Sequence, residues 1–261
     1  MPKHLAVRHA ENMRELGGYK TKDGRRIAHQ KLIRSAGINH IDAQDKHYLN
    51  KYGIKKVVDF RSIEERDSQP DQEIPEAENI FLPIFPIEET KTASASPKKM
   101  MRRMQNGEDA HQQMVEVYKH FVTDDHVRGQ YRKFFDLVLE NSSEKESLLF
   151  HCTAGKDRTG FAAILLLSSL DVNQTTITKD YLATNRYLKK AVEEMYQKAE
   201  KAGVPADSLE GIADMMSAKK EYLQTSFKLI KEHYGTMNNF IHDGIGVTKQ
   251  EIKDLKKIYL L

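Results

Sequence analysis

The stretch SLLFHCTAGKDRTGFAAILLLSSL, residues 147–170, constrains the fold more than any other part of the chain. It begins with a short apolar run, SLLFHC, of the kind that forms a strand covered on both faces. It ends with FAAILLLSSL, which is apolar nearly all round and predicts a central, buried helix. A buried strand that passes through a short loop into a buried helix is a building unit of α/β folds, so we expect that fold class.

Three further short apolar runs predict strands of the same sheet, at residues 31–36, 54–62 and 79–84. Helical patterns alternate with these strands. One helix face is formed by Met114, Val117, Tyr118 and Phe121. A second is formed by Val127, Tyr131, Phe134, Phe135 and Val138, and Asp124 or Asp125 is the N-cap of that helix. A last helix begins at the capping box of Thr248 and Glu251. We therefore expect a central, mostly parallel sheet flanked by helices.

Residues 88–114 fit this alternation poorly, because they are polar and then strongly basic. We interpret them as a helical, lid-like or surface insertion. Their basic run, residues 97–104, is too short to indicate more than a weak contact with an anionic membrane. Since the strand at 147–152 must return to the same sheet, we expect residues 1–261 to form a single domain.

The composition excludes several classes of protein. The 41 basic and 38 acidic residues nearly balance, which does not favour a nucleic-acid partner. No apolar run approaches the length of a membrane span, and no signal peptide is visible, so we expect a cytoplasmic protein or one secreted without such a signal. The single cysteine, Cys152, excludes an intrachain disulfide. We expect a monomer.

The loop between the strand and the buried helix has the features of an anion site. Backbone N–H groups of Thr153, Ala154, Gly155 and Lys156 can converge there with those of the helix N-terminus. Arg158 adds a planar fork that matches two phosphate oxygens. Helix N-termini and cations favour a thiolate, so Cys152 is a candidate nucleophile for phosphoryl transfer.

Other interpretations of this loop are weaker. A nucleotide-binding Walker A loop would need a glycine where Phe150 stands and Ser or Thr where Asp157 stands. A zinc site would need a cluster of ligands, and only His151 is near. A lone cysteine is usually a small buried hydrophobe, but here the strand, the loop, the arginine and the helix all agree on an anion site.

The segment HCTAGKDRTG resembles the HCxxGxxRTG signature of Cys-based protein tyrosine phosphatases. The lysine and aspartate inside it resemble those found in a bacterial branch of that family, which has tyrosine, dual-specificity and phosphoinositide phosphatase activity. The resemblance continues in NMRELGGYKTKDGRRIAHQKLIRSAGINHI, VVDFRSIEER, DYLATN and GIGVTKQEIKDL. It departs at Glu15 and Gln30, where the branch has aspartate and glycine. The resemblance implies a tyrosine phosphatase-like fold.

The resemblance also implies roles for individual residues. Cys152 would form a phosphocysteine intermediate, Arg158 would hold the phosphoryl oxygens, Thr159 would stabilise the departing thiolate, and His151 would order the loop. The chain has no tryptophan, so the usual Trp-Pro-Asp loop is missing and Asp157 is the candidate general acid. Asp59 at the end of a strand competes for this role, although a structural partnership with Arg61 or with a loop N–H group is the stronger interpretation.

Two questions stay open at this point. Lys156 is either a contact for a second substrate phosphate or a solvated cation. The function we expect is metal-free and cofactor-free hydrolysis of phosphotyrosine, with phosphoserine, phosphothreonine and phosphoinositides as further candidate substrates. The alternatives are an inactive phosphate-binding module and, more weakly, a rhodanese-like sulfur transferase.

Overall fold

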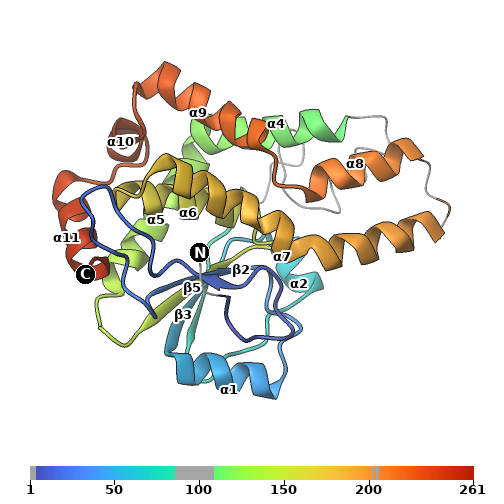
Figure 1. Cartoon of the computed structure of the whole chain (residues 1–261), viewed down its shortest axis with the longest axis horizontal. Coiled ribbons are helices and arrows are strands. Elements are labelled where there is room, and N and C mark those ends of the chain that lie inside the picture. Colours follow the sequence, from blue (N-terminus) through green and yellow to red (C-terminus); the bar gives the residue numbers. More distant parts are fainter. Residues whose placement is uncertain (1–3, 86–108, 202, 204–205) are drawn as a thin grey trace.

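The computed structural model describes residues 4–85, 109–201, 203 and 206–261 (Figure 1). The basic run at 97–104, and the expected insertion at 88–114 as far as residue 108, lie outside the described residues. The described chain forms a central sheet with helices on both faces, so the predicted α/β class is confirmed.

Five strands make up the sheet of the described residues, in the order β1-β2-β5-β3-β4. They are β1 (Arg14–Glu15), β2 (Leu32–Ser35), β3 (Ile54–Asp59), β4 (Glu78–Phe81) and β5 (Ser147–His151). All neighbours pair in parallel except β1, which pairs antiparallel with β2. The four predicted strands are therefore confirmed in place and direction. The sequence analysis did not predict β1, which is too short to leave a pattern.

The side chains on the two faces of the sheet belong to two separate hydrophobic cores, because successive side chains of a strand point to opposite sides. On β5, Leu148 and Phe150 enter the larger core and Leu149 enters the smaller one. Helix α1 (Ala43–Tyr52) packs on the smaller core, and the remaining large helices gather over the opposite face (Figure 1).

The sequence patterns predict four helices beyond α1, at 110–123, 125–140, 158–169 and 249–259, and the structure confirms these; the patterns did not predict the others. The described helices beyond α1 follow in chain order. They are α2 (Ile63–Ser68), α4 (Ala110–Thr123), α5 (Asp125–Glu140), α6 (Arg158–Ser169), α7 (Gln174–Lys201), α8 (Ala206–Met216), α9 (Lys220–Tyr234), α10 (Met237–Asn239), the π-helical turn Phe240–Gly244 and α11 (Lys249–Tyr259). Asp124 is the N-cap of α5, and Thr248 and Glu251 form the expected capping box at α11.

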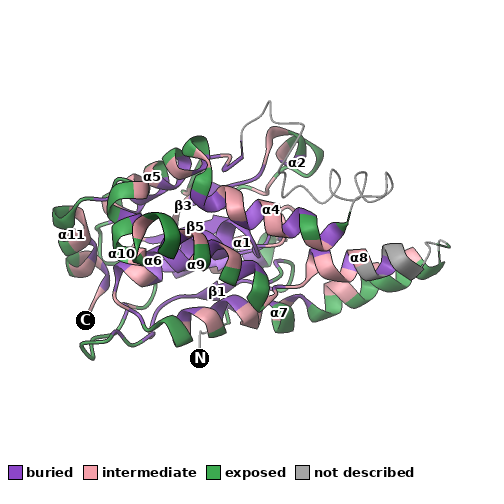
Figure 2. Cartoon of the chain, turned by 90° about the horizontal axis from the view of Figure 1, so that it is seen from above, coloured by how far each residue is buried: buried purple, intermediate pink, exposed green. Residues whose placement is uncertain are grey.

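Helix α6 is buried almost all round, as its composition predicts, and it lies between the sheet and the outer helices (Figure 1). Figure 2 shows that the purple, buried residues gather in the sheet and on the inner faces of the surrounding helices. Its neighbour α7 runs past it and forms a hairpin with α8 that extends away from the sheet (Figure 1). Among the described helices, none combines the length and the apolar character that a membrane span needs.

A buried ion network fastens α7 to the strands. Asp180 on α7 accepts hydrogen bonds from Arg14 Nε on β1 at 2.9 Å, from Arg34 Nη1 on β2 at 2.6 Å and from the Tyr19 hydroxyl at 2.9 Å. Burial opposes the charge of this carboxylate, but the two guanidinium groups outweigh it and lower the pKa of Asp180 to about 2. The network therefore contains one carboxylate that compensates two buried cations.

Removing that carboxylate should be costly, because both arginines would stay buried without their counterion. We expect Asp180→Ala to lower the free energy of unfolding by about 3–5 kcal/mol, measured by urea denaturation. Glu193→Ala on the same helix is the matched control, since its ion pair with Lys189 is exposed and should be worth at most about 1 kcal/mol. Equal losses in the two variants would contradict this assignment.

Candidate active site

The loop that joins β5 to α6, residues 152–157, lies at the carboxyl edge of the sheet. His151 at the end of β5 is in register with Ser35 on β2 and with Asp59 on β3. The ends of three parallel strands thus surround the loop on the side where α/β sheets place their ligand sites. We call this segment the phosphate loop.

Three carbonyl groups of the phosphate loop, those of Thr153, Ala154 and Gly155, point outward. Gly37 N donates to the carbonyl of Thr153 at 3.1 Å, Asn12 Nδ2 donates to those of Ala154 and Gly155 at 3.0 Å, and Arg34 Nη2 donates to that of Gly155 at 2.8 Å. In a trans peptide the N–H group points opposite to the carbonyl, so the following amides face the inside of the loop.

These inward amides are available to a ligand. No described residue accepts a hydrogen bond from the backbone N–H groups of residues 153–157, and the Asp157 side chain does not cap α6. Converging free N–H groups at a helix N-terminus bind anions. The geometry is therefore that of a cradle for a tetrahedral oxyanion, as the sequence predicts.

Gly155 is required by this close packing. Its φ of 62° lies in the left-handed region, and a Cβ atom there would come within 2.2 Å of the Ser35 carbonyl oxygen at the end of β2. That neighbour is backbone of the central sheet and cannot move aside. No side chain other than hydrogen fits at this position.

Arg158 is held by a carboxylate that the sequence analysis did not single out. Glu65 on α2 accepts from both ends of the Arg158 fork, at 2.7 and 2.9 Å, and from the Thr153 hydroxyl. Burial alone would raise the pKa of Glu65, but Arg158 outweighs it and lowers the value to about 2. A capping box with Ser62 fixes the same carboxylate, and this S-x-x-E spacing is the signal that could have revealed it.

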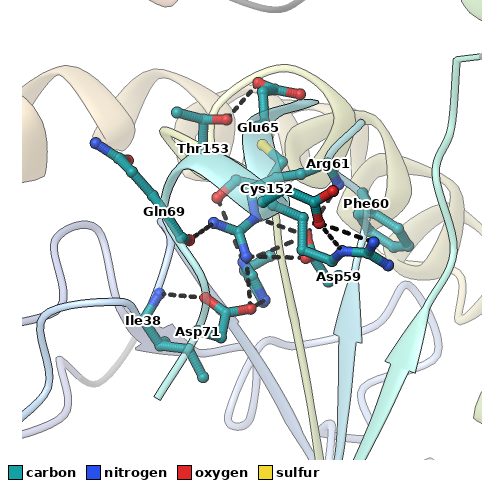
Figure 3. Close-up of polar contacts among 12 residues, drawn as sticks. Ile38, Asp59, Phe60, Arg61, Glu65, Gln69, Asp71, Cys152 and Thr153 are labelled. Carbon is teal, nitrogen blue, oxygen red and sulfur yellow. Dashed lines mark hydrogen bonds and ion pairs between the residues drawn. The ribbon is translucent and has the colours of Figure 1, made fainter. Parts of the chain in front are cut away.

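A second buried network lies behind the phosphate loop (Figure 3). The Arg61 guanidinium bonds to both oxygens of Asp59 at 2.9 Å and lies 2.8 Å from Asp71 Oδ2, and His151 Nε2 lies 3.0 Å from that same oxygen of Asp71. Burial alone would lower the pKa of His151, but the two carboxylates raise it above its ordinary value.

This network bears on the predicted role of Asp59 and on how the charge of its carboxylates is balanced. Asp59 has the structural partnership with Arg61 that we considered the stronger interpretation, and it also accepts from the backbone N–H of Arg61 at 2.9 Å. The ligand atoms of Asp59, Asp71 and His151 lie close enough together for a metal ion. The positive charge between these carboxylates is supplied by the Arg61 guanidinium.

Asp157 and Lys156 lie on the side of the loop that faces the outer helices. The hydroxyl of Tyr118 on α4 donates to Asp157 Oδ1 at 2.9 Å. Lys156 Nζ donates to the carbonyl oxygens of Met215 and Ser217 at 2.6 and 3.1 Å, and it lies 3.3 Å from Asp157 Oδ1. Lys156 is thus neither solvated nor free in this arrangement, and a contact with substrate would require these bonds to open.

The two remaining residues are buried. Cys152 is 2% exposed at the base of the phosphate loop. The Thr159 hydroxyl in the first turn of α6 is also buried and has no hydrogen-bond partner among the described residues. The structure thus brings the predicted residues together around one loop, while Asp59 joins them only through the network behind it.

The comparisons with known proteins agree with this geometry. Residues 5–261 match the model of the tyrosine phosphatase family. A Cupriavidus necator protein assigned by name as a tyrosine-protein phosphatase is 31% identical over 95% of this chain and 86% of its own. The triple specificity protein phosphatase PtpB of Mycobacterium tuberculosis is 24% identical over 88% and 91% of the two chains, and a tyrosine-protein phosphatase of Nostoc commune is 26% identical over 86% and 72%.

The chain belongs to the tyrosine phosphatase family. It is an enzyme of that family, a hydrolase of phosphoric monoesters, and the predicted family is confirmed.

Gly155 gives a direct test of the cradle. We expect Gly155→Ala to abolish binding of inorganic phosphate, because the added methyl group forces the loop away from β2 and turns its amides away from the anion. Isothermal titration with phosphate measures the loss. Gly129→Ala is the control, since a Cβ atom at this position of α5 meets nothing within 4 Å. Phosphate affinity retained in Gly155→Ala would show that the inward amides do not form the anion site.

Proposed function

We propose that this enzyme hydrolyses phosphate monoesters through a phosphocysteine intermediate, with Cys152 as the nucleophile. The observation that carries the proposal is the set of inward amides, which donate to no described residue, in the loop between the buried Cys152 and Arg158. Such a cradle stabilises the equatorial oxygens of a phosphoryl group, and the electrostatic effect is greatest in a site that excludes water.

The first step forms the S–P bond between Cys152 and the phosphoryl group and breaks the bond from phosphorus to the leaving oxygen. The electron pair stays on that oxygen, which takes a proton from Asp157. Arg158, whose guanidinium is oriented by Glu65, would bind two phosphoryl oxygens during this transfer, and its planar fork is better suited to this than the point charge of a lysine.

The second step is attack of water on the phosphocysteine. Asp157 accepts a proton from the water, the S–P bond breaks, and inorganic phosphate leaves. The unpartnered Thr159 hydroxyl is the group we assign to the departing thiolate. The protein supplies all the charge that these steps require, so the proposed reaction needs neither metal nor cofactor.

The substrate we propose is phosphotyrosine in proteins, with phosphoserine, phosphothreonine and phosphoinositides as further substrates. The broader range is supported by the triple specificity stated in the name of PtpB. Lys156 would contribute to phosphoinositide binding only after its bonds to Met215 and Ser217 open.

Release of inorganic phosphate from a phosphotyrosine peptide, a phosphoserine peptide and phosphoinositide vesicles tests the proposal, with EDTA present throughout. We expect Cys152→Ser to lower turnover by on the order of 10⁴-fold or more and to keep phosphate binding, since the cradle is mostly backbone. Turnover of the serine variant within tenfold of the unaltered enzyme would overturn the role of Cys152. Phosphate binding without any turnover by the unaltered enzyme would instead favour an inactive binding module.

The assignment of Asp157 has a separate test, because a general acid matters most for poor leaving groups. We expect Asp157→Asn to slow hydrolysis of an alkyl phosphate by about 10²–10⁴-fold and to change an aryl phosphate with a good leaving group far less. Asp59→Asn is the comparison, and we expect it to show no such selectivity. The reverse pattern would move the acid to Asp59.

A further inference from the structure

Asp157 is held through one of its two carboxylate oxygens. Oδ1 accepts from the Tyr118 hydroxyl at 2.9 Å and lies 3.3 Å from Lys156 Nζ. Both partners are themselves fixed, because Tyr118 is fully buried on α4 and the Lys156 ammonium is anchored by two carbonyls at the end of α8. Helices α4 and α8 pack against each other, so the two partners of Oδ1 come from adjoining elements.

The direction of these bonds follows from the number of protons. The hydroxyl oxygens of Tyr118 and Tyr181 lie 2.7 Å apart, and each phenol has one hydrogen to donate. If Tyr118 donates to Asp157, Tyr181 must donate to Tyr118. Burial, and after it the charge of Asp157, raises the pKa of Tyr118 well above its ordinary value, so this hydroxyl keeps its proton.

Tyr118 also keeps the carboxylate away from the anion cradle. An aspartate just before a helix usually turns its side chain to the free N–H groups of the first turn. Asp157 makes no such bond to α6, although it stands at that position. Its charge is directed to α4 instead, which leaves the amides of the phosphate loop to the substrate.

We propose that Tyr118 is the positioning residue for the general acid: it commits Oδ1 of Asp157 to a structural hydrogen bond and leaves Oδ2 to carry the catalytic proton. This inference rests on the proposed role of Asp157. In the forward step the proton moves from Oδ2 to the leaving oxygen, and the carboxylate that forms is stabilised at Oδ1 by the Tyr118 hydroxyl and the Lys156 ammonium. Tyr118 itself touches no reacting atom.

The test removes one hydroxyl oxygen and keeps the ring. We expect Tyr118→Phe to lower kcat for an alkyl phosphate by on the order of 10²-fold or less, with little change in KM, because misplacement of a reacting group has costs of this size. An aryl phosphate with a good leaving group should be hydrolysed almost as fast as before. A purely structural role would slow both substrates alike, and that outcome would overturn the proposal.

Tyr222→Phe is the matched control. Its ring lies 5.8 Å from that of Tyr118, but its hydroxyl bonds to the carbonyl of Asp214 at 3.3 Å. We expect no leaving-group selectivity from this variant, and the same selectivity as in Tyr118→Phe would contradict the proposal. Tyr181→Phe provides a second test if Tyr118→Phe does not fold. This variant removes the donor to Tyr118 and should give the same leaving-group selectivity at smaller amplitude. A Tyr181→Phe variant without that selectivity would count against the proposal.

A double variant separates this inference from the proposed function. In an Asp157→Ala background, Tyr118→Phe should add no further selectivity, because the group through which it acts is gone. Selectivity in Asp157→Ala without any in Tyr118→Phe overturns the inference and keeps the general acid. No selectivity in Asp157→Ala overturns the role of Asp157, and the proposed role of Tyr118 with it.

Discussion

The active site depends on where the carbonyl groups of the phosphate loop point. Because the carbonyls of Thr153, Ala154 and Gly155 accept hydrogen bonds from Gly37, Asn12 and Arg34, the amides that follow them are turned inward by the protein's own contacts. Arg14 donates to the side-chain oxygen of Asn12 and thereby fixes which end of that amide faces the loop. Asp180 compensates the charges of both arginines, so a carboxylate on α7 holds two of the groups that orient the loop. The anion site is thus organised before the substrate arrives, and binding does not have to order it.

The other buried charges around the loop are also paired with groups of opposite charge. Glu65 holds the Arg158 fork in one orientation, and Asp71 and Arg61 join His151 to the end of β3. Breaking one member of such a set leaves an uncompensated charge in a medium of low polarisability, which costs more than the intact pair contributes. These pairs therefore specify one arrangement of the site more than they add to its stability.

The outer helices have a part in the chemistry as well as in the packing. Helix α4 brings the Tyr118 hydroxyl to Asp157, and the end of α8 brings two carbonyls to Lys156. Lys156 and Asp157, the last two residues of the phosphate loop, are therefore oriented by elements that lie outside the sheet.

The sequence by itself determined the local elements: the strands of the parallel sheet, the buried helix α6, the caps of α5 and α11, and the loop in which Cys152 and Arg158 lie. These follow from apolar periodicity and from spacing over a few residues, which neighbouring side chains alone can encode. Only the tertiary structure decided which distant groups orient the loop. The partners of Arg158, Asp157 and Arg14 lie 93, 39 and 166 positions away along the chain, at Glu65, Tyr118 and Asp180. No local pattern marks such pairs, because a hydrogen bond depends on the position of two atoms in space, and the fold brings those atoms together only when the sheet and its helices have assembled.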